Sequence, residues 1–272
     1  MILHERGRRR LAQGGPGAAA QEWSFRAGVV VAALMWVSPA GYWAGRELFA
    51  RSGQDLVLAF VAAPMIVLGG PWLALAAGVS RRGPAALEVA RRSPAWRVMG
   101  SPVTVTVAFL AGFWVWHVPA VLDAAATSSL LHGLEGACYL VTGLALWGQL
   151  VGSHPFSPPL DNLGRVSVVT VALVGCFLPA AAMVFVDRTW YPAFRHLPGA
   201  ALSVGADQGM AAGLTWVLPV TSLGVVALWT LTAWLNHDQD DDWRLAALVE
   251  ETRLKMAADV PATGERPGGF RA

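Results

Sequence analysis

The stretch VSVVTVALVGCFLPAAAMVFV, residues 166–186, contains no aspartate, glutamate, lysine or arginine. A helix needs about 20 apolar residues, each rising about 1.5 Å, to cross the hydrocarbon core of a bilayer. The apolar residues run continuously instead of alternating with polar ones, which favours a helix over a strand of a membrane barrel. The stretch therefore predicts a transmembrane helix.

Five further stretches also lack these four residue types, and each is at least 19 residues long: 27–45, 56–80, 98–122, 136–160 and 208–237. The stretch at 136–160 is expected to begin earlier, near Ser129, because Leu130, Leu131 and Leu134 extend its apolar pattern. The chain is 55% hydrophobic and only 14% charged, whereas a soluble domain has about 25% charged residues. We predict an all-α fold, a polytopic membrane helix bundle with six transmembrane helices.

The arginines predict the orientation of this bundle. They cluster in the segment 1–24, at Arg26, and in the segment 81–97. These regions lie on the same side of the membrane if the first two stretches both cross it. The positive-inside rule makes that side cytoplasmic. Six spans across 25–237 then place both termini in the cytoplasm, with a charged, partly disordered tail at 238–272. The first stretch is longer than a signal-peptide core, so we expect it to stay uncleaved.

The few polar residues near these stretches gather at their ends. Alternating spans place seven of them at the membrane face opposite the cytoplasm: Gln54, Asp55, His117, His132, Glu135, Asp207 and Gln208. Ionisable residues at membrane depth are costly, and they mark functional sites by default. The sequence therefore predicts one site at the outer face.

Two histidines and a glutamate are the candidate metal ligands of this site. His132 and Glu135 are three residues apart and share a helix face. His117 ends the preceding stretch, and a short loop brings it toward His132. Imidazoles with a carboxylate make a plausible metal site. The alternative interpretation is a polar pair that joins the hairpin, with His117 beside an interfacial tryptophan belt that includes Trp116.

The remaining polar residues are expected to line the site together with Trp116: Gln54, Asp55, Asp207 and Gln208. For Asp55 and Asp207 the alternative is an ordinary helix N-cap, because an aspartate before a helix satisfies its free N–H groups. The basic segment 81–97 has little aromatic interleaving, which favours lipid headgroups over nucleic acid as its partner. No nucleophile, histidine and acid follow one another in a catalytic pattern, so we predict a protein that is not an enzyme.

Six motifs, taken in their order along the chain, resemble the CtaG family: SPA at 38–40, FVAAPMIVLGGP at 60–71, WHVPAVLDAA at 116–125, LHGLEGACYL at 131–140, YPAF at 191–194 and DQGMAAGLTW at 207–216. The resemblance covers roughly residues 25–237. It implies a multi-pass protein of the bacterial plasma membrane that takes part in assembly of caa-type cytochrome c oxidase through copper delivery. Its partners would be the lipid bilayer and subunits of the oxidase or of another respiratory membrane complex.

The chain departs from the family pattern at three positions. The family's H-x-x-Q-H corresponds here to Arg51, Gln54 and Asp55, and its H-x-x-E-H corresponds to His132, Glu135 and Gly136. Three histidines are therefore missing, and a copper site would be reduced to His117, His132 and Glu135. A carboxylate is a poor ligand for Cu(I). The alternative is a metal-free structural subunit or assembly scaffold of a respiratory complex.

Two other functions are weaker alternatives. A b-type haem held by His117 and His132 needs ligands that face each other across a bundle, and two histidines in one tight hairpin oppose each other poorly. A transporter is expected to carry helices broken by glycine and proline in paired positions, and no such pair is visible in the sequence.

Overall fold

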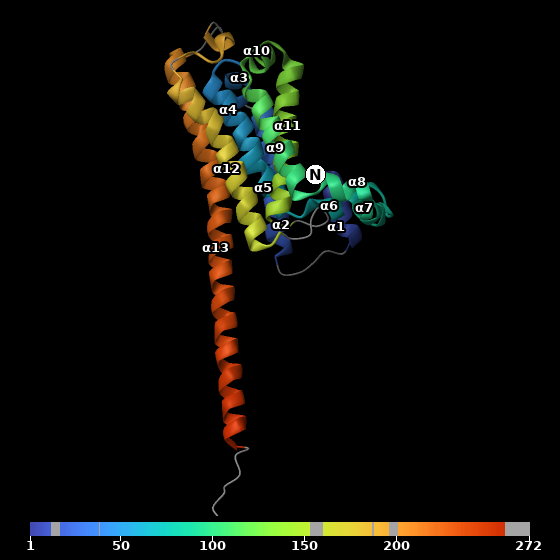
Figure 1. Cartoon of the computed structure of the whole chain (residues 1–272). Coiled ribbons are helices and arrows are strands. Elements are labelled where there is room, and N and C mark those ends of the chain that lie inside the picture. The colour runs from blue at the N-terminus through green and yellow to red at the C-terminus, as the bar shows by residue number, and fades with distance from the viewer. Residues whose placement is uncertain (12–16, 38, 153–159, 187, 196–200, 259–272) are drawn as a thin grey trace, which may run out of the picture. The chain divides into compact units, whose positions relative to one another are not determined.

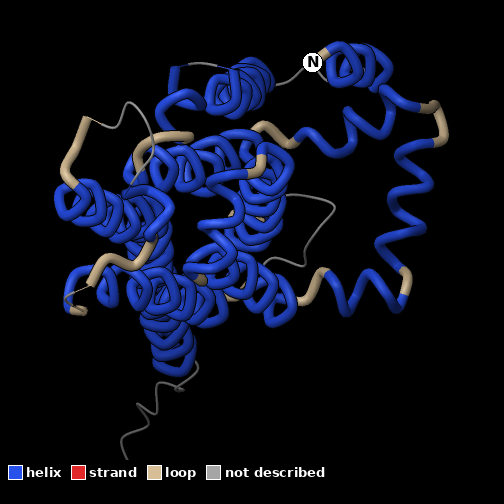
Figure 2. Tube along the Cα trace, turned by 90° about the horizontal axis from the view of Figure 1, so that it is seen from above, coloured by secondary structure: helices blue, strands red, loops and turns tan. Residues whose placement is uncertain are grey.

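The predicted all-α class is confirmed by the computed structural model, which describes residues 1–11, 17–37, 39–152, 160–186, 188–195 and 201–258, with side chains up to residue 236. This part of the chain contains helices and loops and no strand (Figure 2). It divides into two compact units, Met1–Leu228 and Trp229–Ala272. The contacts below belong to the first unit.

The helices follow one another with short connections: α1 (Ile2–Leu11), α2 (Ala18–Val37), α3 (Pro39–Ala44), α4 (Leu48–Val57), the π-helical turn η1 (Leu58–Ala62), α5 (Ala63–Leu68), α6 (Pro71–Val79), α7 (Gly83–Arg92), α8 (Pro94–Met99), α9 (Pro102–His117), α10 (Pro119–Thr127), α11 (Ser129–Leu150), α12 (Asn162–Phe185), the 3₁₀ turn η2 (Pro192–Arg195) and α13 (Val204–Ala258). Prolines stand at the first or second position of many of these helices, where a missing N–H removes no helical hydrogen bond.

Within the described residues, four continuous helices are long and apolar enough to cross a membrane: Leu48–Leu68, Ser129–Leu150, Asn162–Phe185 and Val204–Asn236. A fifth span arises if α9 and α10, which meet at an angle of 71°, are counted together. The predicted stretch at 27–45 falls in α2 and α3, and α2 also contains Glu22 and Arg26. Length and composition therefore support four or five spans. The expected start of the fourth stretch near Ser129 is confirmed, with the Ser128 hydroxyl accepting a hydrogen bond from Leu131 N at 3.4 Å.

The predicted bounds 56–80 were wrong. The span begins at Leu48 and ends at Leu68, and α6 follows after Gly70, whose φ of 58° is left-handed and suits glycine. A charge-free run can begin only after Asp55, because a charged residue is costly in a membrane helix. Arg51 and Asp55 nevertheless lie inside the helix, because the charge of Arg51 has a buried partner, described below.

A π-helical turn interrupts this span just before Pro64. The N–H of Ala63 bonds to the carbonyl of Leu58, five residues back, and Pro64 has no N–H to offer the carbonyl of Ala59. The indole Nε1 of Trp147 on α11 donates to that carbonyl at 2.9 Å. Gly143 permits the approach, since a Cβ there would lie 3.0 Å from Ala59 O. The π-helical turn thus connects α4–α5 to α11.

The two ends of the first unit differ in character. α1, α6, α7 and α8 gather at one end, and α3, α10 and η2 lie at the other (Figure 1). The N-terminal helix α1 packs closely on α6, because a Cβ at Gly7 would lie 1.6 Å from Ala74 O and one at Gly78 would lie 1.9 Å from Leu3 O. The arginines of α1, α7 and α8 are therefore at one end, and the helix starts at Leu48, Ser129 and Val204 are at the other.

Candidate functional site

Four of the predicted site residues line one small buried cavity near the end opposite the arginines: Asp55, Trp116, His117 and Glu135. The cavity has a volume of about 20 Å³, and a cavity needs about 10–15 Å³ to hold one water molecule. Side chains from α4, α9, α10, α11, α12 and α13 surround it; the others are Leu48, Arg51, Ser52, Leu56, Leu122, Tyr139, Met183, Tyr191 and Thr215. The spans therefore do bring part of the predicted site together.

The dominant contact at this cavity is an ion pair between α4 and α11. The Nε of Arg51 donates to Oε2 of Glu135 at 2.8 Å, and a terminal guanidinium nitrogen bonds to the same oxygen. Each side chain is only 1% exposed. Removing charges from water is unfavourable unless they are paired with good geometry. The pair explains how an arginine and a glutamate can both lie inside the bundle.

Asp55 lies one helical turn beyond Arg51 and is 3% exposed. Its Oδ1 has no hydrogen-bond partner among the described residues. One guanidinium thus faces a cavity with two carboxyl groups. A water molecule in the cavity would satisfy the free oxygen of Asp55.

His117 ends α9 and is held by its own helix. Its Nδ1 lies 2.8 Å from the carbonyl of Phe113, and its ring stacks on Phe113 with centroids 4.5 Å apart. A carbonyl only accepts, so Nδ1 carries the proton, and in the neutral ring Nε2 keeps its lone pair. The hydroxyl of Tyr191 donates to the His117 carbonyl at 3.2 Å. His117 is therefore a single, well-oriented imidazole at the cavity.

His132 does not line the cavity, and it contacts Gln54 instead. Its Nε2 lies 2.8 Å from Oε1 of Gln54, while Nε2 of Gln54 donates to the carbonyl of Met35 at 2.8 Å. The amide oxygen only accepts, so the imidazole donates from Nε2. These two residues link α2, α4 and α11.

Asp207, in the first turn of α13, and Glu47, just before α4, form two reciprocal contacts between the starts of these helices. The carboxylate of Asp207 accepts from Leu48 N and from Phe49 N, both at 2.7 Å. The carboxylate of Glu47 accepts from Ala201 N and from Leu202 N, the latter at 3.2 Å. Asp207 is thus a helix cap, but for α4 and not for its own helix.

Gln208 also has a structural position outside the cavity. Its Oε1 accepts from Trp190 N at 3.0 Å, and its Nε2 donates to Met183 O and Arg188 O at 3.0 and 3.1 Å. The residue holds the connection after α12 against α13. The cavity lining thus does not include Gln54, His132, Asp207 or Gln208.

The donor set does not fit a copper ion. Among the described residues no three of histidine, cysteine, aspartate and glutamate lie close enough together to bind a metal. The Glu135 carboxylate is bonded to the guanidinium of Arg51. The Nε2 proton of His132 is directed at Gln54. His117 and His132 each keep one ring nitrogen with a lone pair, but only His117 lines the cavity.

Several side chains that line the cavity are not indicated by the sequence alone. Arg51 stands where the family pattern has a histidine, and no local pattern pairs it with Glu135. Tyr139 is the exception, because it follows Glu135 by one helical turn and this spacing predicts that both line the same face. Met183, Tyr191 and Thr215 come from elements distant in sequence. No local pattern indicates that they meet α4.

Comparison with known proteins identifies the family. The sequence model described as "Cytochrome c oxidase caa3 assembly factor" matches residues 2–237. Uncharacterized proteins of Mycobacterium bovis and Mycobacterium tuberculosis are each 24% identical in an alignment of 221 residues that covers 76% of this chain. The chain spans about a third, 33%, of the length of these curated relatives. No solved structure matches. The match across nearly all of the helical part, together with its membrane-spanning helices, shows that this chain belongs to the cytochrome c oxidase caa3 assembly factor family.

Proposed function

We propose that the protein is a membrane scaffold for assembly of cytochrome c oxidase that works without binding copper itself. The observation that carries this proposal is the buried pair of Arg51 and Glu135. Arg51 occupies a position where the family pattern expects a histidine. Its guanidinium supplies a fixed positive charge to the carboxylate that a metal ion would otherwise contact. No catalytic turnover is part of the proposed role.

We further propose that the cavity end faces away from the cytoplasm in a bacterial plasma membrane. The arginines of α1, α7 and α8 lie at the opposite end, and the positive-inside rule places such residues in the cytoplasm. The reciprocal contacts of Asp207 and Glu47 then close the outer ends of α4 and α13. The surface formed by these outer ends of α4 and α13 is where the scaffold would contact subunits of the oxidase.

The first test is copper binding. Purified full-length protein, loaded with Cu(I) and passed through a desalting column, is expected to retain less than about 0.1 copper per chain, since a single imidazole at the cavity makes a weak site. The variant H117A/H132A is expected to give the same value. About one copper per chain in the wild type, lost in the variant, would contradict the metal-free role and support copper handling.

The second test separates the scaffold from a copper carrier in cells. Deleting the gene in the native host is expected to reduce assembled oxidase, and added copper is expected not to restore it. The plasmid-borne wild type and H117A/H132A are both expected to restore assembly, provided that both reach the membrane in equal amounts. Normal oxidase in the deletion strain would refute the assembly role, and failure of H117A/H132A would refute the metal-free mechanism.

A further inference from the structure

A second, larger cavity lies between α1 and α2, at the arginine-rich end of the first unit. Its volume is about 750 Å³, and its wall contains four arginines and three apolar side chains: Arg6, Arg9, Arg10, Arg26, Met1, Ile2 and Phe25. Glu5 contributes a carboxylate to the same wall. Ligand cavities commonly have volumes of about 300–1,000 Å³. The combination of cations with an apolar wall suits a molecule that is anionic at one end and apolar at the other.

The wall is built by close packing of α1. The ring of His4, only 3% exposed, stacks on Phe25 with centroids 4.0 Å apart. Gly7 allows α1 to approach α6, as described above. Met1 and Ile2 in the first turn remain 56% and 86% exposed. Apolar side chains that are exposed beside arginines are typical of a helix lying at a membrane surface.

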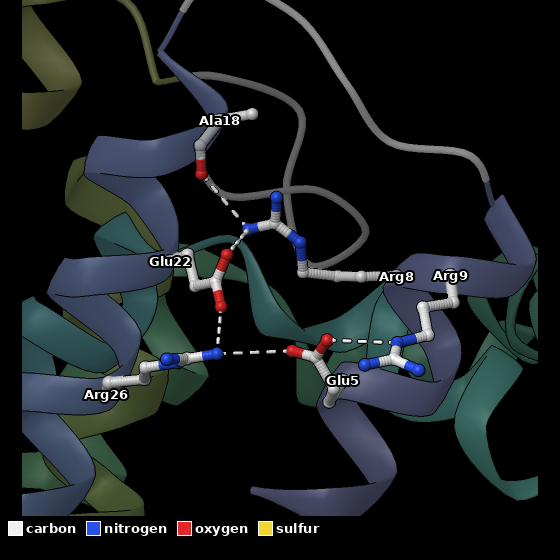
Figure 3. A network of polar contacts seen from close by, with 6 residues as sticks. All are labelled: Glu5, Arg8, Arg9, Ala18, Glu22 and Arg26. Atoms are coloured by element: carbon white, nitrogen blue, oxygen red, sulfur yellow. Dashed lines mark hydrogen bonds and ion pairs between the residues drawn. The ribbon is translucent and has the colours of Figure 1, made fainter.

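Three arginines near the cavity are already paired, as Figure 3 shows. Arg9 contacts Glu5 at 3.1 Å, and Arg26 contacts Glu5 at 3.2 Å. Arg8 contacts Glu22 at 3.4 Å, and Arg26 also pairs with Glu22. Two carboxylates thus join three guanidinium groups and tie α1 to α2.

Two arginines of the wall lie outside this network. Arg10 donates to the carbonyl of Ala77 at 2.6 Å, and within the described residues neither Arg10 nor Arg6 contacts a carboxylate. Burial, followed by the positive charges of Arg6 and Arg81, lowers the pKa of Arg10. Neighbouring cations without a carboxylate repel each other, and an anion between them relieves that repulsion.

We propose that this cavity binds an anionic phospholipid, with the phosphate between Arg6 and Arg10 and an acyl chain along Met1 and Ile2. The cavity lies at the end predicted to face the cytoplasm, where the leaflet is rich in anionic lipid. The apolar wall distinguishes a lipid from free phosphate, which has no group to place there. This inference is independent of the proposed role in oxidase assembly.

The test is a titration of the full-length protein in mild detergent, with binding measured by native mass spectrometry. Long-chain phosphatidylglycerol is expected to bind more tightly than phosphatidylcholine of the same chains. R6Q is expected to weaken phosphatidylglycerol binding about fivefold, since one arginine near a lipid surface contributes about 1 kcal/mol. R82Q, an equal charge change at an exposed arginine of the same end but outside the cavity, is expected to have no effect.

A second variant tests the apolar wall. I2Q is expected to weaken the binding of long-chain phosphatidylglycerol more than the binding of its short-chain form. R6Q is expected to weaken the binding of both forms equally. Equal losses in R6Q and R82Q, or no preference over phosphatidylcholine, would overturn the proposal. Displacement of the lipid by inorganic phosphate at similar affinity would also overturn it, because the cavity would then bind a free anion.

Discussion

Replacing Arg51 with alanine is expected to lower the free energy of unfolding by about 3–5 kcal/mol, because Glu135 would keep a buried charge without a partner. Both side chains are only 1% exposed, so water cannot replace the lost guanidinium. Titration of purified protein with a denaturing detergent, followed by helical circular dichroism, measures the change. Arg46→Ala is the matched control. Arg46 contacts Tyr42 at the same end of the first unit in an exposed hydrogen bond, and its loss is expected to cost less than about 1 kcal/mol.

The double variant R51M/E135L tests whether the lost stability comes from the unpaired Glu135 charge. Replacing both partners of a buried ion pair with apolar residues is often neutral or stabilising. We therefore expect R51M/E135L to unfold at a detergent concentration near that of the wild type, while R51M alone unfolds much earlier. If R51M and the wild type unfold together, the pair does not hold α4 to α11 in the way described.

Replacing Asp207 with alanine is expected to lower the free energy of unfolding by about 2–4 kcal/mol, since Leu48 N and Phe49 N would both lose a charged acceptor. Both hydrogen bonds are 2.7 Å long, and the Asp207 side chain is 5% exposed. The same detergent titration measures the loss. Asp207→Asn keeps one acceptor oxygen and is expected to lose about half as much.

Asp161 provides the matched control for this cap. It caps its own helix, α12, by accepting from Gly164 N at 2.8 Å at an exposed site. Asp161→Ala is expected to cost about 1 kcal/mol, as N-cap replacements usually do. Equal losses at Asp161 and Asp207 would show that the contact between α13 and α4 adds nothing beyond an ordinary cap.

The sequence was a good guide to the apolar helices and a poorer guide to their polar interior. The run at 166–186 predicted α12 almost to its ends, because an uncharged run of that length leaves few alternatives. The start of the span at Leu48 was not predicted, because a reading based on charge ends a span at Arg51 and Asp55. Only the position of Glu135, 84 residues later, makes that arginine acceptable inside the bundle.

The sequence also indicates only part of the candidate site. Asp55, His117 and Glu135, which alternating spans place at one membrane face, line one cavity. Spacing along the chain did not indicate that His132 turns toward Gln54, or that Asp207 caps a helix 159 residues away. These contacts depend on how the helices are ordered around the bundle, and one sequence does not fix that order.

The π-helical turn at Leu58–Ala62 has a consequence for insertions and deletions. A turn of this kind accommodates one residue more than an α-helical turn. Each residue of an α-helix rotates the chain by about 100°. The π-helical turn absorbs its extra residue within one turn, so deleting one residue from it would restore a regular helix and leave the faces of α4 and α5 in register. Deleting one residue from α4 between Arg51 and Leu58 would instead rotate Arg51 by about 100° away from Glu135. The π-helical turn is therefore expected to tolerate a change of length that the α-helical part next to it does not.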